Sequence, residues 1–285
     1  MNMSYFIRGI LLFTVLGMFS CSSNDTTFTV MTYNIRYDNL ADGINKWDNR
    51  KDELYKQVLK YSPDILGTQE GLNHQITFLD KSLSSYKRIG VGREDGRTKG
   101  EYCAIFYDTL KHKVVKEGTF WLSEKPEEVS VGWDAALERI CTYGVFENHN
   151  TKKKILIMNA HFDHLGKKCR VESVKLIENK IKKLTNNKIP VVLMGDLNVL
   201  PFEEPILMLN KFLRDSKKEA TIVKGTEGTF NGFKIDNIEE KRIDYVFGSP
   251  SFKTKSYITI NDMCNEKYIS DHFPIIVEYV LKQNH

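Results

Sequence analysis

The sequence predicts an α/β (α+β) protein built as a four-layer αββα sandwich, in which two mixed β-sheets pack face to face and helices flank both. Segments with the apolar, β-branched and aromatic composition of strands outnumber amphipathic helical segments. Their order combines αβ alternation with consecutive hairpin-like strands, whereas a purely parallel doubly wound sheet would alternate more strictly. The pattern therefore favours two mixed sheets over one parallel sheet.

The strand-like segments share runs of β-branched and aromatic residues. The first, residues 28–34, alternates them with polar residues. The others are residues 65–70, 101–107, 113–121, 139–147, 155–161, 189–193, 242–248 and 275–280. Most lie between turn signals such as Ser62-Pro63-Asp64, which mark where a strand or helix ends.

The helical segments place apolar residues on one face at the spacing of an α-helix. Residues 47–61 carry Leu54, Val58 and Leu59 among charged residues, and residues 169–184 form a longer amphipathic pattern. Shorter helices are expected at residues 74–83 and 205–212.

The composition is that of an ordinary globular protein, with 285 residues, 41% hydrophobic and 27% charged. No repeat, low-complexity tract or Pro-rich linker divides the chain, so we expect a single domain over residues 28–282. The formal net charge of +4 permits an anionic partner. It does not provide the strongly basic stripe typical of nucleic-acid-binding proteins.

The first twenty residues have the pattern of a signal peptide. Arg8 is their only charged residue, and the apolar run at residues 9–19 is too short to span a bilayer comfortably. Ser20 precedes Cys21, an arrangement that resembles a bacterial lipoprotein signal in which Cys21 is lipidated. An uncleaved anchor and a plain secretory signal are the alternatives. The lipoprotein interpretation predicts a protein of a bacterial cell envelope, anchored by lipid to a membrane and facing the periplasm or the outside.

The remaining cysteines do not suggest a metal or redox site. They are Cys103, Cys141, Cys169 and Cys264, and none forms a C-x-x-C pair. An exported compartment would allow disulfides. Cys103 and Cys141 lie in strand-like runs, where we expect free buried thiols.

Polar residues occur at the ends of six apolar runs. These six places are Asn34, Gln69-Glu70, residues 159–164, residues 196–198, residues 242–245 and residues 270–274. Each one alone has a structural explanation, such as a turn residue, an N-cap or a satisfied core histidine. If the strand ends meet at one mouth, however, they form a cluster of carboxylates, amides and imidazoles that requires a cation.

Carboxylate and amide oxygens without clustered thiolates suit a hard ion, Mg²⁺ with Mn²⁺ as a substitute. Such an ion beside neutral donors can polarise a phosphoryl group, while Asn and His donors bind the charge that develops on its oxygens. An ionised Asp can then orient or deprotonate water for in-line attack. The cluster therefore predicts a phosphoryl-transfer centre.

The ordered motifs TYN, TQE, NAHFDH, GDLN, RIDY and SDHFP resemble the endonuclease/exonuclease/phosphatase superfamily, which has the deoxyribonuclease-I-like fold. The resemblance spans roughly residues 28–280, and it implies the same four-layer sandwich. The stretch from Val131 to Arg139 resembles segments in a bacterial branch of this superfamily.

The resemblance also implies roles for the residues of these motifs. Glu70 matches the acid that holds Mg²⁺, with Asn34 beside it and Asp271 sharing the metal sphere. Asp196 matches the acid that positions or deprotonates the attacking water. Asn198 matches the amide that holds the phosphate and Asp196.

The histidines match two further positions of the superfamily. His161 falls where nuclease and sphingomyelinase members place a phosphate-binding or leaving-group histidine. His272 matches the second histidine, and Asp244 matches the acid that fixes its tautomer. A neighbouring acid raises an imidazole pKa and keeps the imidazole a donor to phosphate.

Two candidate substrate-binding residues lie outside the shared motifs. Arg139 is a candidate phosphate clamp, because a guanidinium fork fits phosphate oxygens; an ordinary surface arginine is the alternative. His164 and its neighbour Asp163 are candidates for shaping the substrate pocket.

We therefore predict a Mg²⁺-dependent phosphoester hydrolase, with a phosphodiesterase or nuclease-type activity outside the cytoplasm as the leading interpretation. A phosphomonoesterase and a sphingomyelinase-like phospholipid hydrolase are the alternatives. A non-catalytic ligand-binding lipoprotein is the alternative of another class. The expected partners are a phosphoester substrate (nucleic acid, nucleotide, lipid or sugar phosphate) and the membrane, and we expect a monomer.

Overall fold

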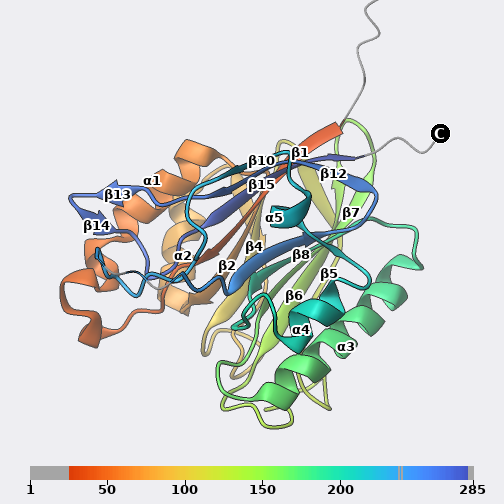
Figure 1. The fold of residues 1–285 in the computed structure, drawn as a ribbon, viewed down its shortest axis with the longest axis horizontal. Helices are drawn as coiled ribbons and strands as arrows, with labels where there is room; N and C mark the ends of the chain where they lie inside the picture. Colours follow the sequence, from red (N-terminus) through yellow and green to blue (C-terminus); the bar gives the residue numbers. More distant parts are fainter. Residues whose placement is uncertain (1–25, 237, 239, 282–285) are drawn as a thin grey trace, which may run out of the picture.

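The computed structural model describes residues 26–281, apart from residues 237 and 239, and its centre consists of two mixed β-sheets stacked face to face (Figure 1). The first sheet has seven strands. In spatial order they are β10 (Ile222–Lys224), β12 (Phe252–Thr259), β15 (Ile275–Leu281), β1 (Thr26–Asn34), β2 (Ile65–Gly71), β4 (Tyr102–Asp108) and β3 (Tyr86–Ile89).

The second sheet has six strands. Their spatial order is β5 (His112–Trp121), β6 (Ile140–Asn148), β7 (Lys154–His161), β8 (Val191–Asp196), β11 (Asp244–Gly248) and β9 (Arg214–Asp215). A separate two-stranded hairpin is formed by β13 (Met263–Cys264) and β14 (Lys267–Tyr268).

Helices cover the outer face of each sheet. On the seven-stranded sheet they are α1 (Lys51–Tyr61) and α2 (Asn73–Ser82), and on the six-stranded sheet α3 (Lys167–Thr185) and α4 (Glu204–Leu209). The short helix α5 (Ser216–Glu219) packs beside β11 and β12. The order helix, sheet, sheet, helix confirms the predicted four-layer sandwich.

Side chains of the central strands alternate between two apolar layers, as the pleat of a strand requires. In β1, Val30 points into the layer between the sheets and Met31 packs under the helices. In β8, Val192 points into the layer between the sheets and Leu193 packs under the helices of the other face. Because both faces of these strands are buried, their sequences read as nearly continuous apolar runs.

The strand directions give the molecule two distinct ends. Strands β1, β2, β7 and β8 end, and β11 and β15 begin, at one edge of the sandwich, which we call the mouth. The opposite end, which we call the far pole, contains the first residue of β1, Thr26, its pairing partner Leu281 and the first residue of β7, Lys154.

Some elements differ from the sequence prediction. The helix expected from Trp47 begins at Lys51, because two 3₁₀ turns, η1 (Leu40–Asn45) and η2 (Trp47–Asn49), precede it. Strands β3 and β12 were not predicted, nor were the short strands β9, β10, β13 and β14. In β12 the inward positions include Thr254 as well as Phe252, so the apolar signal is weak despite the alternation.

The predicted thiol state of the cysteines is confirmed. Cys103 and Cys141 are buried and free, as predicted; Cys169 is also buried and free, and Cys264 is free and half-buried. Among the described residues, no helix is both long enough and apolar enough to cross a membrane. The predicted signal peptide and Cys21 lie outside the described residues.

Candidate active site

The polar residues at the strand ends meet at the mouth. In the six-stranded sheet, Asp196 pairs with His161 of β7 on one side and with Asp244 of β11 on the other. Asn34 of the seven-stranded sheet joins them, because its Nδ2 donates to Asp196 Oδ2 at 3.0 Å. All four side chains are buried. The two sheets therefore contribute to a single polar cluster.

An irregular backbone turns Glu70 into the mouth. Its φ is 67°, a left-handed value, and the β2–β4 register shifts between Thr68 and Gly71. A bulge of this kind re-aims a side chain at the rim of a sheet. Glu70 Oε1 accepts from Asn34 Nδ2 at 2.9 Å, and Oε2 accepts from the backbone N–H of Tyr37 at 3.1 Å. These two bonds fix the carboxylate.

Asp196 follows a glycine that the strand pairing requires. A Cβ on Gly195, whose φ is 142°, would lie 1.9 Å from the backbone oxygen of Ala160 in β7. Asp196 Oδ1 accepts from the backbone N–H of Asn198 at 2.9 Å, which orients the carboxylate. Burial, together with nearby carboxylates, raises the pKa of Asp196 to about 7.

His272 and Asp244 form a buried pair. His272 Nδ1 lies 2.8 Å from Asp244 Oδ2, so Nδ1 carries the proton and Nε2 points toward the cluster. Burial alone would lower the pKa of His272, but the charges of Asp244 and Asp196 outweigh it and raise the pKa well above its ordinary value. The two carboxylates therefore favour the protonated imidazolium form of His272. Asp244 Oδ1 is buried without a partner among the described residues.

The pKa of His161 is shifted in the opposite direction to that of His272. Its Nε2 lies 3.6 Å from Asp196 Oδ2 and 3.2 Å from Asn198 Nδ2. Burial and the positive charge of Arg139 lower its pKa well below the ordinary value. The pKa values of the two histidines thus move in opposite directions: the surroundings of His161 favour the neutral imidazole and those of His272 the imidazolium. Environments that separate two pKa values in this way are typical of acid–base sites.

Arg139 lies beside His161, as a phosphate clamp would require. Its Nη1 is 3.2 Å from His161 Nε2, and its Nη2 is 2.9 Å from His164 Nδ1. Asp163 Oδ2 accepts from Arg139 Nε at 3.2 Å and from the backbone N–H of Ala136 at 3.1 Å. The guanidinium is only 5% exposed, so the surface alternative for Arg139 is wrong.

Glu101 and Arg93 also belong to this cluster, although no motif in the sequence marked them. Glu101 Oε2 accepts from Arg93 Nη1 at 2.7 Å and lies 3.7 Å from His161 Nδ1. Burial raises the pKa of Glu101 to about 7, although Arg93 opposes this. Arg93 Nε is buried without a partner among the described residues. Both residues lie in the loop between β3 and β4, whose glycines were the only signal in the sequence.

Arg36 was also missed. It donates through Nε and Nη2 to Asp42 at 3.0 and 2.9 Å, and Nη1 lies 4.0 Å from Glu70 Oε2. Its Nε is also 3.7 Å from Asp271 Oδ2. A guanidinium therefore lies between two of the predicted metal ligands. Arg36 lies two residues after the end of β1 and has a positive φ of 56°. No pattern in the sequence marked it as part of the site.

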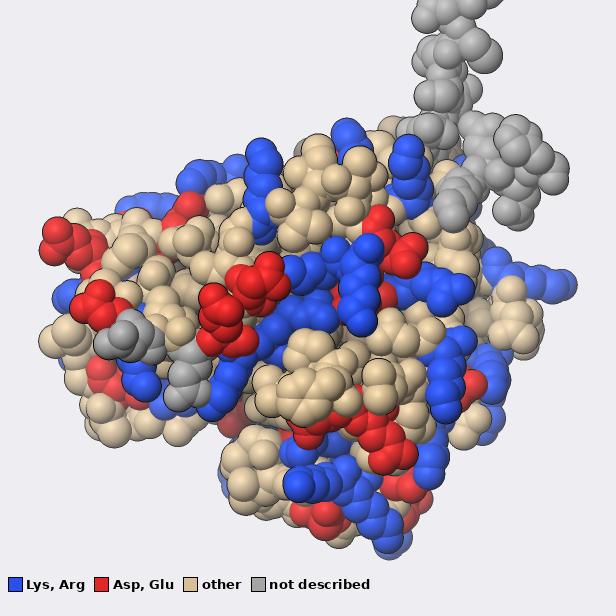
Figure 2. Space-filling model, in the orientation of Figure 1, with Lys and Arg blue, Asp and Glu red and all other residues tan. Residues whose placement is uncertain are grey.

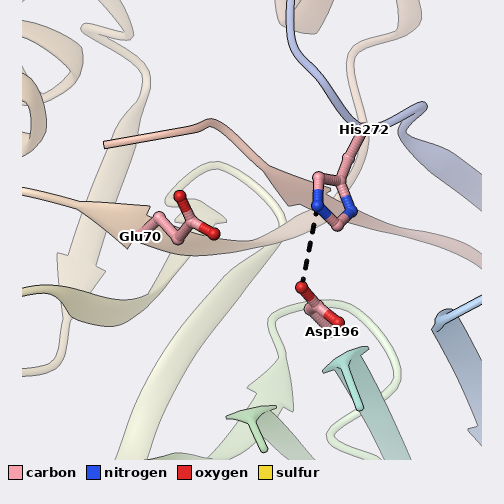
Figure 3. Close-up of side chains that lie close together, drawn as sticks. All are labelled: Glu70, Asp196 and His272. Carbon is pink, nitrogen blue, oxygen red and sulfur yellow. Dashed lines mark ion pairs between the residues drawn. The ribbon is translucent and has the colours of Figure 1, made fainter. Parts of the chain in front are cut away.

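Three side chains of the mouth, one of them Glu70, converge on a common space that offers a position for a metal ion. Figure 3 shows Glu70, Asp196 and His272 pointing toward a common space from three different segments. Each offers one ligand atom, and these atoms all lie within 4.8 Å of one another. The dashed line in Figure 3 joins His272 Nε2 and Asp196 Oδ2, 3.8 Å apart. Two carboxylates in this group fit a hard cation.

The other predicted metal residues are close but differently engaged. Asn34 presents its amide nitrogen to the acids, because its Oδ1 accepts from the backbone N–H of Arg36 at 3.1 Å. As a metal ligand it would have to turn its amide. Asp271 is buried, and burial, with the charge of Glu70, raises its pKa to about 6. A bound cation would lower the pKa of this carboxyl.

Comparison with known proteins agrees with this geometry. The family described as the endonuclease/exonuclease/phosphatase family matches residues 31–272. The structure of a mannosyl-6-phosphatase from Bacteroides thetaiotaomicron VPI-5482 is similar to this chain with a TM-score of 0.86 and 41% identity. That similarity covers 89% of this chain and 100% of the phosphatase.

Two curated relatives are more distant. An uncharacterized protein of Acanthamoeba polyphaga mimivirus is 29% identical over 251 residues, which cover 82% of this chain and 92% of the relative. The 3'-5'-exoribonuclease subunit Ccr4 of Mycosarcoma maydis is 23% identical. That match covers 63% of this chain but only 35% of the length of the exoribonuclease subunit. The family match, the fold and the cluster at the mouth agree, and the chain is a phosphoester hydrolase that belongs to the endonuclease/exonuclease/phosphatase family.

Proposed function

We propose that this hydrolase cleaves phosphomonoesters with a divalent metal ion, Mg²⁺ or Mn²⁺, at the mouth. One observation carries the proposal. Asp196 Oδ2 lies 3.6 Å from His161 Nε2 and 3.8 Å from His272 Nε2, in a buried site that also contains Glu70. A carboxylate between two imidazoles, beside a metal position, can accept a proton from water while neighbouring donors bind phosphate.

Glu70 would hold the metal ion, with Asp271 and Asn34 beside it. When bound, the ion polarises a non-bridging phosphate oxygen and offsets the charge of the clustered acids. The donors are predominantly oxygen atoms, which suits Mg²⁺ or Mn²⁺ better than zinc.

Asp196 would act as the general base. It accepts a proton from the attacking water as the water oxygen bonds to phosphorus and the ester P–O bond breaks on the opposite side. With the cluster charge offset, its carboxyl is ionised at neutral pH, as a base must be. The hydrogen bonds from Asn34 and from the backbone of Asn198 hold the carboxylate in one orientation.

The remaining polar residues would bind the phosphate. His272, cationic because of Asp244, donates from Nε2 to a phosphate oxygen, and the Asn198 amide donates to another. Neutral His161 contacts that amide and Arg139. We assign it to positioning the phosphate-binding side of the site. A non-catalytic binding protein would not need this complete set of acid, base and donors.

The relatives support the choice of substrate class. The phosphatase that is 41% identical to this chain is named for mannosyl 6-phosphate, which supports a sugar phosphomonoester as the first substrate to test. A phosphodiester, which the motifs alone favoured, is the second candidate. Its support is the exoribonuclease relative, which is 23% identical and of which this chain spans only a third.

We further propose that the enzyme acts as a monomer in a bacterial cell envelope, outside the cytoplasm, on a lipid anchor at Cys21. The support is the sequence pattern of residues 1–21. A Cys21→Ser variant should leave the membrane fraction or accumulate with its apolar segment uncleaved. Lipid labelling of the variant would contradict the assignment of Cys21.

A substrate panel tests the reaction. Purified enzyme is treated with a chelator, supplied with Mg²⁺ or Mn²⁺, and given mannose 6-phosphate, p-nitrophenyl phosphate, bis-p-nitrophenyl phosphate, RNA and sphingomyelin. We expect metal-dependent phosphate release from the two monoesters, and loss of about 10²–10⁴ in kcat for Asp196→Asn. The control Asp262→Asn makes the same chemical change at an exposed position and should retain activity.

Each outcome decides between specific alternatives. Cleavage of RNA or the bis-ester ahead of both monoesters would support the diesterase. Hydrolysis of sphingomyelin alone would support the phospholipase-type alternative. Equal, metal-independent rates for the wild type and Asp196→Asn would refute the catalytic assignment altogether.

A further inference from the structure

A cavity of about 760 Å³ opens at the far pole, at the end of the sandwich opposite the mouth. It is enclosed by the last turns of α3, the first residues of β7 and β8, and the turn after β11. Four lysines and one acid line it: Lys153, Lys154, Lys182, Lys188 and Glu178. None of these residues takes part in the site at the mouth.

The charge of this cavity is only partly compensated. Lys182 pairs with Glu178 at 2.6 Å, and Lys154 lies 3.8 Å from Glu147. Within residues 26–281, apart from 237 and 239, no acid pairs with Lys153 or Lys188. Figure 2 shows lysine and arginine side chains along the right-hand edge of the molecule, the side on which β7 and β12 begin in Figure 1. The far pole therefore presents positive charge.

The floor of the cavity is apolar. It is formed by Ile181, Val191, Leu213 and Leu281, which are buried beneath the lysine rim. Leu110, on the turn between β4 and β5 at the same pole, is 81% exposed. Lysines around an apolar surface, with an exposed leucine at the same pole, match the layered chemistry of a membrane interface, where lysines meet anionic headgroups and apolar groups enter between them.

The predicted tether reaches this pole and not the mouth. Thr26 pairs with Leu281, and only five residue steps separate Thr26 from Cys21, a reach of at most about 18 Å. Strand β1 then runs nine residues to Asn34, which puts the mouth about 26 Å from Thr26. A lipid at Cys21 would hold the far pole at the membrane, and its reach is too short for the mouth to face the bilayer.

We propose that the far pole rests on a membrane surface rich in anionic phospholipid headgroups, with the lysine-lined cavity against the headgroups and the mouth turned away from the bilayer. Each lysine at such a surface contributes attraction, and the contact adds to whatever anchor the chain carries. An enzyme held in this orientation acts on phosphoesters that reach it from the aqueous side and not on the headgroups beneath it. This interaction is independent of the proposed reaction.

Lysine labelling of the full chain tests the orientation. The protein is mixed with vesicles of phosphatidylglycerol and phosphatidylcholine, or of phosphatidylcholine alone, and treated with a membrane-impermeant, amine-reactive ester. Mass spectrometry then scores each lysine. We expect loss of labelling at Lys153 and Lys188 on the anionic vesicles only. Lys99 and Lys234, which are exposed on mouth loops, should label equally on both.

Two double variants provide the matched comparison. Lys153→Gln with Lys188→Gln should abolish the protection of Lys154 and Lys182 on anionic vesicles. Lys99→Gln with Lys234→Gln removes the same charge at the mouth and should leave that protection intact. Unchanged circular dichroism and thermal unfolding show that both variants fold. High salt should abolish the protection in the wild type, because exposed charges are screened.

Several results would overturn the proposal. Protection of Lys99 and Lys234 would mean that the mouth faces the membrane. Equal labelling on both kinds of vesicle, or absence of any vesicle contact, would remove the role of the anionic headgroups. Protection by inorganic phosphate in solution, without vesicles, would identify the cavity as a small-anion site instead.

Discussion

The Nδ1 atom of His272 lies 2.8 Å from Asp244 Oδ2, while its Nε2 faces Asp196 at 3.8 Å. One imidazole thus connects a buried acid behind the site with a buried acid inside it. The first contact fixes the tautomer, and the second directs the free edge of the ring toward the position of the phosphate. This relationship makes the charge of His272 depend on a residue that need not touch substrate.

Replacement of Asp244 by Asn should remove this support for the charge of His272. Without the Asp244 charge, burial dominates and lowers the pKa of His272, so the cationic donor is lost at a lower pH. We expect kcat/KM to fall about 100-fold or more at neutral pH, and the alkaline limb of its pH profile to move to lower pH. An unmoved alkaline limb would show that His272 does not act as a cation.

Metal binding can be measured without activity. A divalent ion that binds the folded state alone stabilises it by about 2.7 kcal/mol at 100 times its Kd. For a domain of this size that corresponds to roughly 5–10 °C in Tm. Mg²⁺ should raise the Tm of the wild type and leave that of Glu70→Gln unchanged. The exposed control Glu266→Gln should respond as the wild type does, and a full response in Glu70→Gln would exclude Glu70 as a ligand.

Asp163 should contribute stability that disappears in acid. Although burial opposes it, hydrogen bonds from Gly166 and Leu165 and the charge of Arg139 lower its pKa to about 2. A group with a depressed folded-state pKa stabilises above its unfolded pKa of about 4, and the contribution fades as pH falls toward 2.

We therefore expect Asp163→Asn to lower the free energy of unfolding by about 1–3 kcal/mol at neutral pH. The difference from the wild type should narrow in acid, as measured by denaturant titration from pH 7 to pH 2. Asp262→Asn, with the same chemical change at an exposed ion pair, should show little loss at any pH. A constant difference across the range would contradict the linkage to ionisation.

Arg139→Lys should reduce activity although it keeps the charge. Lysine has one nitrogen and cannot reproduce the separate contacts of the guanidinium with Asp163, His161 and His164. We expect kcat/KM to fall roughly 10-fold or more, measured on the best monoester. The same change at Arg88, which pairs with Asp80 at an exposed position, should have little effect. Equal losses in both variants would point to a general effect on folding.

Gly195→Ala should destabilise the protein strongly, by about 3 kcal/mol or more, because the new methyl group would collide with the β7 backbone next to Asp196. Gly43→Ala is the matched control, since it also has a positive φ but no atom within 4 Å of the added Cβ. It should cost about 1 kcal/mol. Equal losses in chemical denaturation would mean that backbone strain, and not the close approach of β7 and β8, decides the effect.

Local sequence was sufficient for most of the long elements and for the predicted core of the site. Alternation and apolar runs mark strands such as β1 and β8, and polar residues at their ends are visible because they interrupt those runs. Asn34, Glu70, Asp196 and His272 were found in this way, with the help of the family resemblance. Strand β12 was missed because Thr254 occupies a buried position where the pattern expects an apolar residue.

Only the tertiary structure decided which side chains of the site contact one another. Glu101 looks like the first residue of an ordinary strand, and its contact with His161 joins segments 60 residues apart. The placement of Arg36 between two acids and the lysine-lined cavity at the far pole likewise depend on which segments the sheet order brings together. The sequence by itself determines most of which apolar residues are buried, because periodicity is local. It does not determine which buried side chains meet, because that depends on the order and register of strands distant in the chain.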